Sequence, residues 1–249
     1  MKLLRKIAII FFDVIDLYYH QRKILKFIRK SNINLKYFFD VGSHMGTYSD
    51  LILKNFEDSK VFMFEPQINI FKKIKIKYKY YKNVKIYNCA ISDKSTQKKI
   101  YINKHDLTSG LSPLNLKSNK YLQFKAKLFG TTTSRMILKE PKIKTKKLFT
   151  IIKLNKIKKI DLVKIDTEGH EFEVLDGAKN YIKKDTPDIL LEINKNCFDQ
   201  CLAFLLPIGY NAYYVDEKNK KIERINHFTN NLIQKEGSNC YLSVNSKKL

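Results

Sequence analysis

A cluster of small, polar and acidic residues, Asp40-Val-Gly-Ser-His-Met-Gly46, closes a short apolar run that begins at Tyr37. Gly42 lets the chain turn sharply, and Gly46 lets a following helix come close and leaves room for a ligand. A dinucleotide-binding turn would carry a second close glycine for a pyrophosphate, but His44 stands at that position. The spacing therefore favours a cofactor without phosphate.

The next apolar run ends in an acidic residue, Glu65, which Pro66 follows. A carboxylate at the carboxyl end of a strand can accept hydrogen bonds from both hydroxyls of a ribose, which indicates an adenosine cofactor. Asp40 and the backbone amides of the glycine turn can meet an ammonium group and a carboxylate. Together the two segments predict binding of S-adenosylmethionine, and they place an NAD-linked dehydrogenase last among the alternatives.

A second cluster of reactive side chains follows a later apolar run and surrounds Gly169. Charged groups at the end of an apolar strand are costly to bury unless they have a function, which favours a chemical role for Asp166. Acids such as Glu171 and Glu173 are equally explained as the start of a helix. There is no His-rich ligand spacing, so we expect no metal, although Asp166 and Glu192 could together hold a divalent cation. The members of the cluster are Lys164, Asp166, Glu168, His170 and Glu171.

Short runs rich in Val, Ile and Phe alternate with helical patterns, which predicts a doubly wound α/β fold with a mostly parallel, seven-stranded sheet. Ligands bind such sheets at the carboxyl ends of the strands, where both clusters stand. Strands are expected at residues 37–41, 61–65, 84–90, 162–166, 189–193, 211–215 and 240–244. Helices are expected from about residue 47 and over residues 67–80, 172–181 and 198–206.

Four segments taken together resemble the FkbM family of S-adenosylmethionine-dependent methyltransferases. The resemblance runs from about residue 38 to residue 214 and implies a Rossmann-like class I methyltransferase fold. It also implies methyl transfer to a hydroxyl, on a sugar or glycan, a lipid-linked glycan or a secondary metabolite. One departure is Leu154-Asn155, where members usually carry Leu-Asp. The four segments are Asp40-x-Gly-Ser-His-x-Gly46, Phe64-Glu-Pro66, Lys164-Ile-Asp-Thr-Glu-Gly-His-Glu171 and Pro187-Asp-Ile-Leu-Leu-Glu192.

The resemblance assigns the cofactor site residue by residue. The glycine turn would line the methionine end of the cofactor, Glu65 the ribose, and residues 90–92 the rim of the adenine. The expected cofactor-binding residues are Asp40, Gly42, Ser43, His44, Gly46, Ser49, Glu65, Pro66, Ala90, Ile91 and Ser92.

The resemblance also implies which residues face the methyl group and the acceptor. A hydroxyl is a weak nucleophile, so a positioned base helps as its proton leaves. We expect Asp166 or His170 to be that base, oriented by Glu168 or Glu192. The expected catalytic residues are Lys164, Asp166, Glu168 and His170.

The net charge is +24, and only five of the 48 basic residues are arginine. Such a charge suits an anionic partner, so an RNA ribose O-methyltransferase is one alternative. Nucleic-acid recognition favours arginine interleaved with aromatic residues, which the basic stretches lack, so the expected partner is a hydroxyl-bearing small molecule or glycan. A non-catalytic scaffold on a membrane surface is the other alternative.

Residues 1–36 are predicted to form a basic extension with an amphipathic helix, and residues 37–249 a methyltransferase domain. Asp13 and Asp16 interrupt the apolar start, so neither a spanning helix nor a signal peptide is expected. We expect a cytoplasmic protein that can contact the inner membrane face through residues 1–30. A Lys-rich insertion is expected at about residues 105–148, at the edge of the active site. The cysteines, expected as buried free thiols of a reducing compartment, are Cys89, Cys197, Cys201 and Cys240.

Overall fold

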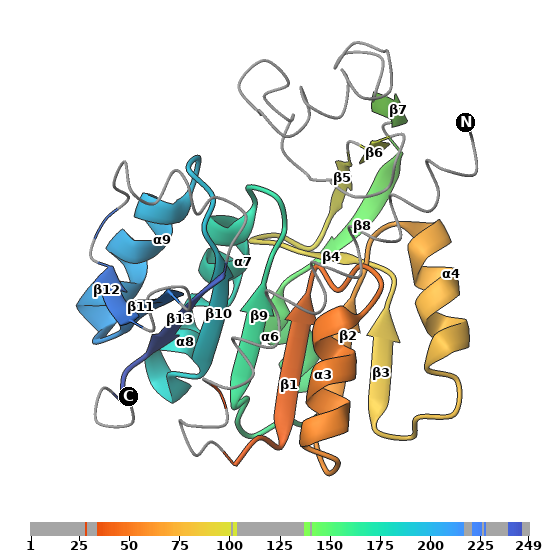
Figure 1. Cartoon of the computed structure of the whole chain (residues 1–249). Helices are drawn as coiled ribbons and strands as arrows, with labels where there is room; N and C mark the ends of the chain where they lie inside the picture. The colour runs from red at the N-terminus through yellow and green to blue at the C-terminus, as the bar shows by residue number, and fades with distance from the viewer. Residues whose placement is uncertain are drawn as a thin grey trace, which may run out of the picture.

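A computed structural model of the chain describes residues 28, 34–100, 102–103, 137–139, 141–216, 221–225, 227 and 239–245. A central sheet of eight strands forms the middle layer, with helices on both faces (Figure 1). Its strands, in spatial order, are β12 (Lys221–Ile225), β11 (Asn211–Asp216), β13 (Asn239–Ser243), β10 (Asp188–Glu192), β9 (Leu162–Ile165), β1 (Tyr37–Val41), β2 (Lys60–Phe64) and β3 (Val84–Tyr87).

The five strands from β10 to β3 run parallel, whereas β13, β11 and β12 add antiparallel pairs at one side. The doubly wound α/β class is therefore confirmed, with one strand more than the seven expected. The additional strand is β12, whose Lys-Ile-Glu-Arg-Ile sequence carries three charges. Charge is tolerated there because β12 lies at the edge of the sheet, where one side has no partner strand.

The strand register brings the two predicted clusters to one edge of the sheet. Val41 pairs with Phe64 and with Ile165, and Ile165 pairs with Leu191. Parallel strands that end at the same level deliver the residues that follow them to the same edge. These following residues are Gly42, Glu65, Asp166 and Glu192.

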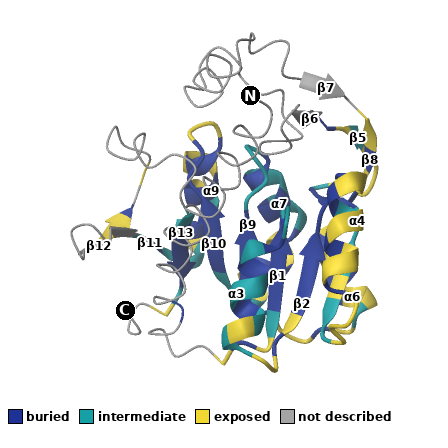
Figure 2. Ribbon diagram, turned by 45° about the vertical axis from the view of Figure 1, so that its right-hand side comes forward, coloured by how far each residue is buried: buried dark blue, intermediate teal, exposed yellow. Residues whose placement is uncertain are grey.

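Helices α3 (Thr47–Asn55) and α4 (Ile68–Lys77) cover one face of the sheet (Figure 1). Their buried Ile52 and Ile74 join a cluster with the strand residues Phe38 and Met63. The strands alternate apolar residues between the two faces, so each face has its own apolar layer. Figure 2 shows that the central strands are buried and that the outer side of α4 is exposed.

The other face is covered by four helices, α6 (Leu148–Leu154), α7 (Glu171–Gly177), α8 (Lys179–Asp185) and α9 (Phe198–Leu205). Ile151, Val174 and Leu202 pack there with the strand residues Phe39 and Phe64. One helix over residues 172–181 was expected, but the chain turns at residue 178 and forms α7 and α8 instead. The turn lets both short helices place apolar residues on the sheet.

The third expected strand is also shorter, because the main-sheet strand ends at Tyr87 and Ala90 joins a separate small sheet. In that sheet β4 (Ala90–Ile91) and β5 (Gln97–Lys99) pair with β8 (Lys142–Lys146). A second pair joins β6 (Ile102–Asn103) to β7 (Ile137–Lys139). Figure 1 places β5 to β8 beyond the carboxyl ends of the parallel strands, on the same side as the candidate site.

Several expectations fall on residues that the structure does not describe. They include most of the N-terminal extension and the expected insertion up to residue 136. The last part of the expected insertion forms the strands β7 and β8. Among the described residues, no helix has the length and apolar character needed to cross a membrane. The four cysteines are free and buried, as expected.

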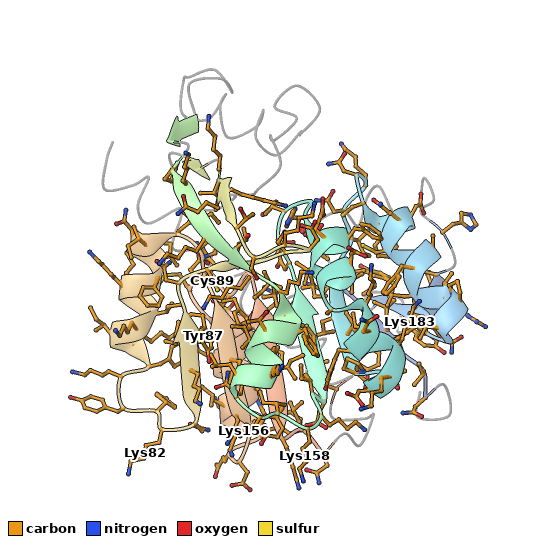
Figure 3. All side chains as sticks on the ribbon, turned by 180° about the vertical axis from the view of Figure 1, so that it is seen from behind. Lys82, Tyr87, Cys89, Lys156, Lys158 and Lys183 are labelled. Atoms are coloured by element: carbon orange, nitrogen blue, oxygen red, sulfur yellow. The ribbon has the colours of Figure 1, made fainter. Side chains whose placement is uncertain are left out.

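Some of the positive charge lies far from the candidate site. Lys82 precedes β3, and Lys156 and Lys158 precede β9, so these side chains stand at the amino ends of the parallel strands (Figure 3). The residues predicted to bind the cofactor and the acceptor stand at the opposite, carboxyl ends. These lysines therefore do not contribute to the site itself.

Candidate functional site

The turn after β1 is held by the end of the neighbouring strand. The backbone amides of Gly42 and Ser43 both donate to the carbonyl of Phe64, at 3.2 and 3.1 Å, and the amide of Gly46 donates to the carbonyl of Ser43 at 2.7 Å. Gly42 and Gly46 each adopt a left-handed backbone with φ of 77°, which favours glycine. The turn is thus fixed in shape before any ligand binds.

Gly42 joins this turn to the turn that follows β9. A side chain at residue 42 would collide with the backbone carbonyl of Asp166. The carbonyl of Gly42 accepts a hydrogen bond from Lys164 Nζ at 2.9 Å. The two sequence clusters are therefore in direct contact through backbone as well as side-chain atoms.

Gly46 has a different role from the expected space for a ligand. The hydroxyl of Tyr78 and the methyl group of Met63 occupy the place that a side chain on Gly46 would need. Tyr78, from the end of α4, lies with its hydroxyl 2.8 Å from the carbonyl of Gly46 and 2.6 Å from Asp50 Oδ1. The sequence carried no signal for this contact, because Tyr78 reads as one more aromatic residue of an amphipathic helix.

We expect Tyr78→Phe to lower the free energy of unfolding by about 1–3 kcal/mol, because it removes the hydroxyl shared by Asp50 Oδ1 and the carbonyl of Gly46 and leaves that carbonyl, among the described residues, only the amide of Asp50. Tyr80→Phe is the matched control, since Tyr80 is 81% exposed and its change should stay within about 0.5 kcal/mol. Urea unfolding of both variants measures the difference. Equal losses in the two would contradict the assigned role of Tyr78.

Asp40 is fully buried at the end of β1. Its Oδ2 accepts a hydrogen bond from Ser49 Oγ at 2.6 Å. Its Oδ1 lies 3.5 Å from Lys164 Nζ, an ion-pair contact, yet among the described residues it has no hydrogen-bond donor. A buried carboxylate oxygen without a donor is costly, so it fits a donor group supplied by a ligand.

Glu65 is held in one orientation by the backbone. Its Oε2 accepts from the amide of His44 at 3.0 Å and its Oε1 from the amide of Gln67 at 2.8 Å. Burial raises the pKa of Glu65 to about 7, although these two amides and Lys164 act in the opposite direction. Each carboxylate oxygen retains a lone pair, so the group can accept further hydroxyl donors. Next to it, the carbonyl of Pro66 accepts from Asn88 Nδ2 at 3.0 Å.

His170, one of the two expected bases, has Ser92 and Glu173 as its side-chain neighbours, in place of the expected Glu168 or Glu192. Its Nε2 stands 3.0 Å from Ser92 Oγ, and its Nδ1 stands 3.3 Å from Glu173 Oε2. The ring is 4% exposed, and burial lowers its pKa. The ring therefore joins Glu173 of α7 to Ser92, which directly follows the buried Ala90 and Ile91 of β4.

Lys164 contacts the carboxylates of both Asp40 and Asp166. Its Nζ lies 3.3 Å from Asp166 Oδ2, opposite its contact with Asp40, and 5.2 Å from the centre of the Tyr48 ring. Burial by itself would lower the pKa of Lys164, but the charges of Asp166 and Asp40 outweigh burial and raise it. Lys164 is therefore a buried cation that positions Asp40 and Asp166, not a base.

The turn after Asp166 depends on Glu171, which was interpreted only as a helix-start acid. Its Oε1 accepts from the amide and the hydroxyl of Thr167, at 2.8 and 2.9 Å, and its Oε2 accepts from the amide of Gly169 at 3.0 Å. These bonds hold Glu168 at a φ of 57°, which is unfavourable for a residue with a side chain. The buried carboxylate of Glu171 thereby fixes the backbone conformation of Glu168.

Asp166, Glu168 and Glu192 form a carboxylate cluster in which the nearest oxygens all lie within 4.8 Å of one another. Glu192 ends β10 and is buried, while Asp166 and Glu168 are partly exposed. Burial, followed by the charges of Asp166, Glu168 and Glu171, raises the pKa of Glu192 well above its ordinary value. The cluster is thus open to solvent on the side of Asp166 and Glu168.

A family profile described as the methyltransferase FkbM domain matches residues 40–223. The chain belongs to the FkbM methyltransferase family. The match begins at Asp40 and ends within β12, so it includes both ends of the site. A comparison with curated proteins found no match.

One solved structure of the family shares the fold. The FkbM methyltransferase from Methylobacillus flagellatus is 13% identical with a TM-score of 0.52, over 84% of this chain and 44% of that chain. A precorrin-6y C5,15-methyltransferase from Geobacter metallireducens is 13% identical with a TM-score of 0.41, over 86% of this chain and 82% of that chain. The chain therefore spans less than half of the FkbM structure it resembles, and the likeness shows a shared fold.

The family's usual Asp is replaced by Asn155 at the end of α6. Asn155 Nδ2 donates to the hydroxyl of Tyr87 at 2.9 Å, and its Oδ1 accepts from Lys85 Nζ at 2.8 Å. Both partners belong to β3. The departure thus serves a contact between α6 and β3, apart from the carboxylate cluster.

Proposed function

We propose that this FkbM family member is an S-adenosylmethionine-dependent O-methyltransferase. Its acceptor would be a hydroxyl on a sugar or glycan, a lipid-linked glycan or a secondary metabolite. The observation that carries the proposal is the partly exposed carboxylate of Asp166, held by Lys164 beside the cofactor-facing carboxylate of Asp40.

The residues present fit the cofactor. Asp40 Oδ1, buried and without a hydrogen-bond donor among the described residues, suits the ammonium group of the methionine end. Glu65, fixed by two backbone amides, suits the two ribose hydroxyls. When bound, S-adenosylmethionine supplies a sulfonium methyl group whose carbon–sulfur bond breaks as the carbon–oxygen bond forms.

Asp166 acts as the base in this proposal. It accepts the proton of the acceptor hydroxyl, while Lys164 holds the carboxylate in place from the buried side. Most of the acceleration comes from holding the acceptor oxygen in line with the methyl group. His170 has a structural role in this proposal, because its ring nitrogens already contact Ser92 and Glu173.

Incubation with labelled S-adenosylmethionine and separate fractions of cell glycans, lipids and RNA tests the proposal. Label in the glycan or lipid fraction, removed by Asp166→Asn, is the expected result. Label confined to RNA would replace the acceptor class with the ribose of RNA, the reading that the +24 charge favours. If calorimetry detects no binding of the cofactor, the proposal of an enzyme is wrong and the alternative of a non-catalytic scaffold is favoured.

Cofactor affinity should rise with pH. The carboxylate form of Glu65 accepts the ribose hydroxyls, but the pKa of Glu65 is about 7 in the free protein. Below that pH a proton must leave on binding, so the Kd should fall by about tenfold per pH unit and level off above it. Calorimetry from pH 5.5 to 8.5 measures the slope.

Glu65→Gln is the matched variant for this pH dependence. The cofactor ionises in the same way with both proteins, but the variant lacks the carboxyl group at residue 65. The variant should therefore bind the cofactor more weakly at high pH, and its Kd should depend less on pH. A wild-type profile parallel to that of Glu65→Gln would contradict the role given to Glu65.

A further inference from the structure

The carboxylate cluster brings together three acidic side chains from separate parts of the chain. Asp166 follows β9, Glu168 belongs to the turn after it, and Glu192 ends β10. Their nearest oxygens lie within 4.8 Å of one another. Two oxygens bound to one Mg²⁺ or Ca²⁺ at 2.0–2.6 Å stand at most about 4–5 Å apart, so the spacing suits a single cation.

Glu192 provides an independent indication that a ligand belongs here. Its side chain is 6% exposed, and among the described residues its Oε2 has no hydrogen-bond partner. A buried carboxylate oxygen normally has a donor, because burial without one is costly. A carboxylate oxygen of Glu192 belongs to the cluster, so a ligand bound by the cluster can supply the missing partner.

Lys164 does not supply the missing positive charge. It already contacts Asp40 at 3.5 Å and Asp166 at 3.3 Å, and it donates to the carbonyl of Gly42. Among the described residues, no ion pair joins a lysine to Glu192. Lys164 is already shared between Asp40 and Asp166, so it leaves Glu192 Oε2 without a partner.

The backbone holds Glu168 toward the cluster at a cost. Its left-handed φ of 57° is unfavourable, and the buried carboxylate of Glu171 keeps it there through bonds to Thr167 and Gly169. A strained residue fixed beside two other carboxylates is typical of a preformed ligand site. Asp166 and Glu168 are partly exposed, so a cation can enter from solvent.

We propose that Asp166, Glu168 and Glu192 bind one divalent cation that prefers oxygen ligands, such as Mg²⁺ or Mn²⁺. Its catalytic role rests on the proposed methyltransferase function. A hydroxyl is far less acidic than a carboxyl group, so Asp166 alone is a weak base for it. A cation that contacts the acceptor hydroxyl lowers the pKa of that hydroxyl and makes proton transfer to a carboxylate feasible.

Titration of the full chain with Mn²⁺, followed by electron paramagnetic resonance of the free ion, tests the site directly. Wild type should bind one Mn²⁺ per chain, and Glu192→Gln should weaken binding by about tenfold or more. Glu168→Gln, at a more exposed position, gives a second variant if Glu192→Gln does not fold. Asp176→Asn is the matched control, because Asp176 is an exposed acid of α7 that contacts Lys179.

The absence of stoichiometric Mn²⁺ binding by wild type would overturn the site. So would unchanged binding by both cluster variants. Calorimetry with S-adenosylmethionine on the same protein separates this inference from the proposed function. Mn²⁺ binding without cofactor binding would remove the function and keep the site, whereas methyl transfer without Mn²⁺ binding would do the reverse.

Discussion

Asp166→Asn is expected to lower kcat for methyl transfer by about 10²–10⁴-fold while S-adenosylmethionine binds with nearly unchanged affinity. The amide has the shape of the carboxylate but cannot accept the proton of a hydroxyl. Asp166 reaches solvent, whereas Asp40 and Glu65, the acids proposed to bind the cofactor, are buried at the ends of neighbouring strands. The substitution thus separates catalysis from cofactor binding. Single-turnover kinetics at saturating cofactor and Mg²⁺, with calorimetry, measure the two effects.

Two further variants make this prediction specific. Asp176→Asn removes an exposed acid of the adjacent helix and should keep full turnover. His170→Ala should mainly lower the free energy of unfolding and should change kcat little, because the ring contacts Ser92 and Glu173 and not Asp166. Full turnover by Asp166→Asn would exclude Asp166 as the base. A loss confined to His170→Ala would return that role to the imidazole.

The strands that position the site were predictable because their apolar runs are short and end at conspicuous residues. The expected strand at residues 37–41 agrees fully with β1, and the two acids Glu65 and Asp166 directly follow β2 and β9. A parallel register then brings them to one edge of the sheet. Local pattern and the rules of doubly wound folds were sufficient for this part.

Tertiary partners could not be predicted in the same way. Tyr78 and Glu171 stand in helical patterns that explain them without any site, and only their contacts with Gly46 and Gly169 reveal their roles. Glu192 was recognised as the end of a strand, but its missing hydrogen-bond partner depends on everything that surrounds it. Such features arise from packing between distant segments, which periodicity does not encode.

The same limit applies to the two glycines of the first turn. Gly42 was interpreted as allowing a sharp turn and Gly46 as space for a helix and a ligand, and the turn itself is confirmed by its left-handed backbone. The structure fills that space with protein atoms, with Tyr78 beside Gly46 and the carbonyl of Asp166 beside Gly42. Glycine is therefore required here for close contact between the parts of the site.

Gly42→Ala should consequently lower the free energy of unfolding by more than about 4 kcal/mol. The new methyl group would collide with the backbone carbonyl of Asp166, and backbone atoms at the ends of two central strands cannot move aside easily. Gly209→Ala is the matched control, because Gly209 also has a positive φ, of 103°, but has no atom within 4 Å of the added carbon. Its cost should be limited to backbone strain of about 1–2 kcal/mol. Urea unfolding of both variants measures the difference, and similar losses would mean that backbone strain alone, and not the contact between the two turns, requires glycine at residue 42.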